Sequence, residues 1–142
     1  MKVEEILFDS EIDDWNQYTS EFGEKIIGKS KIALVIFDRK GNIFGVYINE
    51  KIDEYEEYIN DPHAFVFSLK SNGRLDQPMK FPIKNPEKSL LIYGETSEWL
   101  LSIGSDGGNN GHDDINIMKK DCQHQSPGNG CAQICYEYNG IE

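Results

Sequence analysis

The sequence is poor in long apolar runs, and this scarcity excludes membrane-spanning helices. The longest uninterrupted apolar stretch is residues 32–37, far below the roughly 20 residues that a membrane-spanning helix needs. The first residues include Lys2, Glu4 and Glu5 with no long apolar core after them, so we expect no secretory signal. These absences predict a cytoplasmic protein, with the nucleus as the alternative compartment.

Basic side chains are also scarce. The chain has 14 Lys and Arg against 25 Asp and Glu, a formal net charge of −11, which argues against a broad electrostatic grip on nucleic acid or on an acidic membrane. Residues 1–62 carry 15 acidic and 7 basic side chains, a net of −8, whereas residues 63–142 carry 10 and 7, a net of −3. The acidic first half suits a basic protein partner or a bound cation, and its simplest role is solubility.

Cysteine is limited to Cys122, Cys131 and Cys135 near the C-terminus. An odd number in a chain without a secretory signal indicates reduced thiols. Together with His124 they would provide enough ligands for tetrahedral zinc. If residues 131–138 form a strand, however, Cys131 and Cys135 lie about 13 Å apart at ~3.3 Å per residue, too far for one ion. We therefore expect structural thiols and no bound metal or cofactor.

The 142 residues fit a single domain, residues 1–142, with a short strand at residues 5–8 and one amphipathic helix at residues 11–27. The helix is predicted from apolar side chains three or four residues apart. These side chains are Ile12, Trp15, Tyr18, Phe22 and Ile26.

The remainder of the chain has the spacing of short strands joined by hairpins. Residues 31–37 are a continuous apolar run, which predicts a strand buried on both faces. Asn72-Gly73 is a strong hairpin signal, and the prolines around residues 78–83 predict an edge strand. Further strands are expected at residues 42–48, 64–69, 89–93, 98–103, 114–118 and 131–138. The predicted fold class is α+β, mainly β: a two-sheet antiparallel β-sandwich with one or a few flanking helices.

The segment Gly23-Glu-Lys-Ile-Ile-Gly-Lys-Ser30 matches the phosphate-loop pattern G-x-x-x-x-G-K-S/T. A true phosphate loop follows a strand and opens a helix, because the helix N-terminus completes the anion site. Here the predicted helix precedes the segment and a strand follows it. We therefore expect no nucleotide site.

Three other chemistries have candidate residues but no coherent pattern. A nucleophilic site would draw on Cys122, His112, His124 and Asp113, whose pairing the sequence does not reveal. Residues 106–114 offer oxygen ligands for calcium but lack the spacing of an EF-hand loop. Lys80, Lys84 and Lys88 would be the local basic patch of a nucleic-acid binder.

Several segments together resemble the TLDc domain family. The similarity begins near Ile6-Leu-Phe-Asp-Ser10 and continues at Gly41-Asn-Ile-Phe-Gly-Val-Tyr47, which resembles the family's hairpin G-N-V-F-G-G-Y. The most specific stretch is Asn60-Asp-Pro-His-Ala-Phe-Val-Phe-Ser-Leu69, similar to D-P-N-A-F-L-F-S-L. Residues 108–117, with Gly111-His-Asp113, resemble the family's glycine-rich G-G-G-H-D-L-Y-I. Val46, Asn109 and Asn110 depart from these motifs, and the N-terminal helical portion is shortened.

The resemblance implies a β-sandwich and a non-catalytic protein-interaction or regulatory module. Family members are associated with protection against oxidative stress, and several bind the vacuolar proton ATPase. Its subunits are therefore the expected protein partners. The alternative is a small thiol- or metal-dependent enzyme, or a stress-responsive nucleic-acid-binding regulator.

We assign no catalytic residue, and we expect most positions in the family motifs to be structural. Gly45 and Gly111 should permit special backbone geometry, while Phe65 and Phe67 should share one face and pack the core. The candidate positions are Phe44, Gly45, Tyr47, Asp61, Pro62, Gly111, His112 and Asp113.

Overall fold

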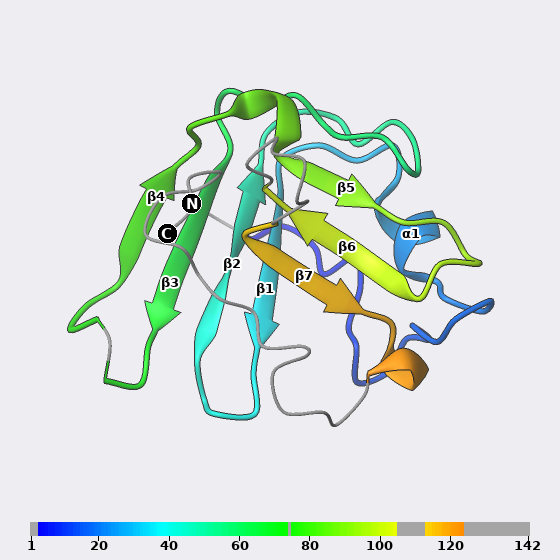
Figure 1. Ribbon diagram of the computed structural model, residues 1–142, viewed down its shortest axis with the longest axis horizontal. Helices are drawn as coiled ribbons and strands as arrows, with labels where there is room; N and C mark the ends of the chain where they lie inside the picture. Colours follow the sequence, from blue (N-terminus) through cyan, green and yellow to red (C-terminus); the bar gives the residue numbers. More distant parts are fainter. Residues whose placement is uncertain (1–2, 74, 105–112, 124–142) are drawn as a thin grey trace.

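Two antiparallel sheets dominate the computed structural model, which describes residues 3–73, 75–104 and 113–123 (Figure 1). The first sheet has the order β1 (Ile32–Phe37), β2 (Ile43–Ile48), β3 (Phe65–Lys70) and β4 (Met79–Pro82). The second has the order β5 (Leu90–Ile92), β6 (Trp99–Ile103) and β7 (Ile115–Met118). This arrangement confirms the predicted mainly-β sandwich.

The core lies between the two sheets, because alternate side chains of each strand point toward the opposite sheet. Phe44, Val46 and Ile48 of β2 are almost completely buried. They belong to one hydrophobic cluster with Leu101 and Ile103 of the second sheet. The sandwich is therefore held by apolar side chains from both layers.

The predicted strand pairs agree closely with the structure. β3 and β4 form the hairpin around Asn72-Gly73, where Gly73 has a φ of +82°. β4 lies at an edge of the first sheet, and β5 pairs with β6 as expected. The strand predicted at residues 131–138 lies outside the described residues.

The burial predicted for the apolar run at residues 31–37 is wrong. β1 pairs only with β2 among the described strands, so it is an edge strand. Its burial alternates, and Val35 and Phe37 are 45% and 73% exposed. The run therefore buries one face, because no described layer covers the other.

The N-terminal prediction is also wrong, because residues 5–8 form no strand and residues 11–21 form no helix. The α-helix α1 covers only Phe22–Ile26. Tyr18 has a left-handed φ of 69°, and Ile12 is 82% exposed. Carboxylates of this segment accept hydrogen bonds from nearby backbone N–H groups, such as Asn16 N–H to Asp14 at 2.9 Å. Such local bonds compete with the helical ladder.

Two short 3₁₀ helices, η1 (Pro86–Lys88) and η2 (Lys120–Cys122), complete the described elements. None of the described helices is long and apolar enough to cross a membrane. After α1 the chain passes through Gly28, with a φ of +85°, into β1. The segment at residues 23–30 that matches the phosphate-loop pattern thus follows a helix into a strand. This order is opposite to that of a true phosphate loop.

Candidate functional site

Asp61 organises the corner where β2 ends and β3 begins. These strands are antiparallel neighbours, with Tyr47 paired to Phe65, so the residues after β2 lie beside those before β3. The Asp61 side chain is completely buried. Its Oδ2 accepts hydrogen bonds from the N–H groups of Asn49 at 2.6 Å and Glu50 at 3.2 Å. Its Oδ1 accepts one from the N–H of His63 at 2.9 Å.

The backbone of Asp61 links this corner to the second sheet. Its N–H donates to the Pro86 carbonyl of η1 at 3.0 Å. The Ser89 hydroxyl, just before β5, donates to the Pro86 carbonyl at 2.7 Å and also lies 3.2 Å from the Asp61 carbonyl. Ser89 is completely buried, so this polar contact also satisfies a group that burial would otherwise penalise.

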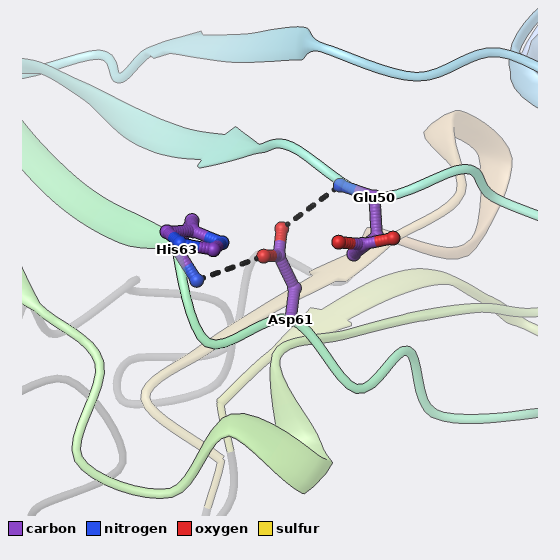
Figure 2. Close-up of side chains that lie close together, drawn as sticks. All are labelled: Glu50, Asp61 and His63. Atoms are coloured by element: carbon purple, nitrogen blue, oxygen red, sulfur yellow. Dashed lines mark hydrogen bonds between the residues drawn. The ribbon is translucent and has the colours of Figure 1, made fainter.

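Glu50 and His63 stand on either side of the Asp61 carboxylate (Figure 2). One potential ligand atom from each of the three side chains lies within 4.8 Å of the others. Glu50 and His63 are exposed, whereas Asp61 is buried. We call Glu50, Asp61 and His63 the corner cluster.

Asp113 is the one residue of the predicted Gly111-His112-Asp113 motif that the structure describes; Gly111 and His112 lie outside the described residues. The Tyr58 hydroxyl donates to its Oδ1 at 3.2 Å. The Lys88 ammonium lies 4.7 Å from the centre of the same tyrosine ring. Tyr58 thus joins Asp113 to the segment before β3.

Two candidate positions of the hairpin motif at residues 41–47, Phe44 and Gly45, lie in β2 and have structural roles. Phe44 is a core residue, 1% exposed. A side chain on Gly45 would overlap the Leu34 carbonyl of β1 and come within 2.8 Å of Phe67 Cζ. Gly45 therefore permits a close backbone approach, as expected.

The outer face of the first sheet carries Phe65 and Phe67, which we expected in the core, together with Tyr47. Tyr47 stacks on Phe65 with ring centres 5.1 Å apart, and Phe65 meets Phe67 edge-on at 6.4 Å. Val66, between them, is the buried one. Phe65 and Phe67 do share a face, but their expected packing in the core is wrong, because β3 turns its Val66 side inward.

The three lysines proposed as a basic patch are not one free cluster. The Lys80 ammonium lies 4.0 Å from the Phe65 ring centre, whereas Lys88 lies over Tyr58. Lys84 also has an interaction partner. The Lys80 and Lys88 contacts are cation–π arrangements on two different aromatic rings.

Cys122 is buried in η2. Burial, followed by the negative charge of Asp121, raises the pKa of its thiol. A raised pKa reduces the thiolate fraction, which is the opposite of what a nucleophilic cysteine needs. The other suggested zinc ligands, His124, Cys131 and Cys135, lie outside the described residues, as does most of the calcium candidate at residues 106–114.

Lys119 is a buried cation beside this thiol. It is 1% exposed, and its ammonium donates to the carbonyls of Gly94 at 2.6 Å and Glu95 at 2.8 Å. Burial lowers its pKa. The adjacent hollow, lined partly by Ser20 and Tyr93, has a cavity volume of about 10 Å³, room for about one water molecule and far too small for a ligand. Lys119 therefore ties the turn between β5 and β6 to the end of β7.

An acidic loop at residues 50–57 joins the corner to the rest of the connection between β2 and β3. The aliphatic Ile52 is completely buried and anchors the loop. Its acidic side chains are exposed. These side chains are Glu50, Asp53, Glu54, Glu56 and Glu57.

The sequence analysis singled out Asp61, Pro62 and Asp113 as candidate positions, but not Glu50 or His63. Pro62 is exposed and takes no part in the corner cluster. A usable signal was available: Glu50 follows one predicted strand, and His63 precedes the strand expected to pair with it. Antiparallel pairing brings such positions together.

The comparison with family models gives one match. The TLDc domain model matches residues 3–135, nearly the whole chain. The searches of curated proteins and of solved structures gave no match. The chain belongs to the TLDc domain family.

Proposed function

We propose that this protein is a non-catalytic, TLDc-type interaction module that links a protein partner to the oxidative-stress response. The observation that carries the proposal is the family match over residues 3–135. The family resemblance favours subunits of the vacuolar proton ATPase as the partner. The expected compartment is the cytoplasm, where such a partner exposes its soluble subunits.

The acidic loop is the surface we propose for this contact. Its carboxylates are exposed on a segment that Ile52 holds against the core. Opposite charge on a partner would speed association and orient it. A rigidly anchored loop also reduces the conformational entropy lost on binding.

The non-catalytic character is supported by the state of the described cysteine. Cys122 is buried, and the raised pKa of its thiol disfavours nucleophilic chemistry. Among the described residues, the Asp61 carboxylate is held by backbone N–H groups and the Asp113 carboxylate by the Tyr58 hydroxyl. These arrangements suit structural support of a binding surface.

Affinity purification of the full chain from cells, analysed by mass spectrometry, tests the proposal. We expect pump subunits among the recovered proteins, under ATP-replete or ATP-depleted conditions, with a change in recovery after peroxide exposure. Failure to recover any pump subunit in all conditions would rule out that partner.

A charge-reversal pair tests the surface. Glu54→Lys with Glu57→Lys should reduce partner recovery by at least about tenfold, because both changes put positive charge opposite a basic partner. Glu87→Lys, at the exposed position of η1, changes the net charge without altering the loop and should retain recovery. Equal losses in both variants would contradict a role for the acidic loop.

A further inference from the structure

We propose that the corner cluster binds one divalent transition-metal ion of the zinc class. Glu50, Asp61 and His63 would supply three protein ligands, with water completing the coordination. This inference stands on the geometry of the corner and does not depend on the proposed protein partner.

Asp61 has one acceptor position left for a ligand. An ionised carboxylate offers about four lone-pair positions. Two backbone N–H groups bind Oδ2, whereas only the His63 N–H binds Oδ1. A fully buried carboxylate oxygen thus keeps one unused lone pair among the described residues. The three N–H groups also hold the carboxylate in a fixed orientation, as hydrogen bonds to metal-ligating carboxylates do.

Glu50 and His63 lie on opposite sides of the Asp61 carboxylate (Figure 2). Both side chains are exposed, and within the described residues neither makes a side-chain hydrogen bond or ion pair. The ligand atoms lie within 4.8 Å of one another. Two ligands that each lie ~2.0–2.2 Å from zinc are separated by roughly 3.4 Å in a tetrahedral site. Binding would require the exposed Glu50 and His63 side chains to rotate toward the ion.

The donor set selects the class of ion. An imidazole nitrogen with two carboxylates suits zinc and its first-row neighbours, whereas magnesium and calcium prefer oxygen ligands alone. Two carboxylates also meet here without a basic side chain in ion-pair contact among the described residues. A dication would neutralise this local charge and clip the end of β2 to the start of β3.

Cobalt titration of the full chain, stripped of metal with a chelator, tests the site. We expect one Co²⁺ to bind with d–d absorption and without a thiolate-to-cobalt charge-transfer band, and Zn²⁺ to displace it. The missing band separates the corner cluster from a site built on Cys122, Cys131 or Cys135. Displacement by equimolar Mg²⁺ would overturn the assignment to a transition metal.

Two variants and a control locate the ion. Glu50→Gln and His63→Asn each remove one donor from an exposed side chain, so each should weaken Co²⁺ binding by at least about tenfold. Asp53→Asn, an exposed acid in the same loop, should bind as tightly as the parent. Urea unfolding without metal should be unchanged in all three variants. No saturable binding, a thiolate band, or unchanged affinity in Glu50→Gln and His63→Asn would overturn the proposal.

Discussion

The Oδ2 atom of Asp61 accepts the backbone N–H of Asn49 at 2.6 Å, across twelve residues of sequence. The Asp61 side chain is completely buried, so this bond closes the connection between β2 and β3 inside the protein. The same carboxylate serves the N–H groups of Glu50 and His63. One side chain therefore accepts hydrogen bonds from three backbone N–H groups that lie outside the paired parts of β2 and β3.

Asp61→Ala should destabilise the fold by about 2–4 kcal/mol, because it leaves buried N–H groups without acceptors. The free energy of unfolding, measured in urea with a chelator present, checks this. Asn60→Ala changes the preceding exposed residue and should stay within about 0.5 kcal/mol of the parent. Similar stability of the two variants would contradict the organising role of Asp61.

Gly45→Ala should destabilise the protein by about 3 kcal/mol, because the new methyl group overlaps backbone of β1 and crowds Phe67. Gly73→Ala is the matched comparison. Gly73 has a φ of +82° with open space around it, so only backbone strain of about 1 kcal/mol is expected. Thermal and urea unfolding of both variants measures the difference. A smaller cost at Gly45 than at Gly73 would contradict the close approach of β1 and β2.

The ion pair between Lys25 and Asp13, with an N–O distance of 2.6 Å, should make the free energy of unfolding depend on pH in the acid range. The hydrogen bond from Lys25, together with the Asp9 N–H, lowers the pKa of the Asp13 carboxyl from its ordinary 3.8. A folded pKa below the unfolded one stabilises the protein above pH 3.8, and this stabilisation is lost as the pH falls through the folded pKa. Lys25→Met should move the Asp13 titration back toward 3.8.

Carboxyl NMR titration of Asp13 measures that shift directly. Lys51→Met is the control, because Lys51 pairs with Asp53 on an exposed loop and should leave the Asp13 midpoint unchanged. An Asp13 midpoint that is the same in the parent and in Lys25→Met would show that the ion pair does not form in solution.

Cys122 should react with a disulfide reagent at least about tenfold more slowly than free cysteine, because burial hides the thiol and a raised pKa depletes the thiolate. A background carrying Cys131→Ser and Cys135→Ser isolates its signal. Unfolding in urea should restore the ordinary rate. A native thiol faster than free cysteine would instead favour the thiol-enzyme alternative.

The positions of most strands were predictable, because the turn residues and prolines that mark them act locally. Asn72-Gly73 and the prolines Pro78, just before β4, and Pro82, at its end, act within a few residues, and they located that hairpin and its edge position correctly. The helix expected at residues 11–27 failed for a reason that periodicity does not reveal. Carboxylates such as Asp14 bind nearby backbone N–H groups, and only α1 remains helical.

The sequence alone determined the acidic balance, most of the strands and the family motifs, because these depend on composition and on short-range patterns. Tertiary structure decided which face of β1 and β3 is buried, and it placed Glu50, Asp61 and His63 together. Both outcomes depend on pairing and layering between segments far apart in the chain. Asp61 and Pro62 were visible as a motif, but the buried carboxylate that holds three backbone donors exists only once β2 and β3 are paired.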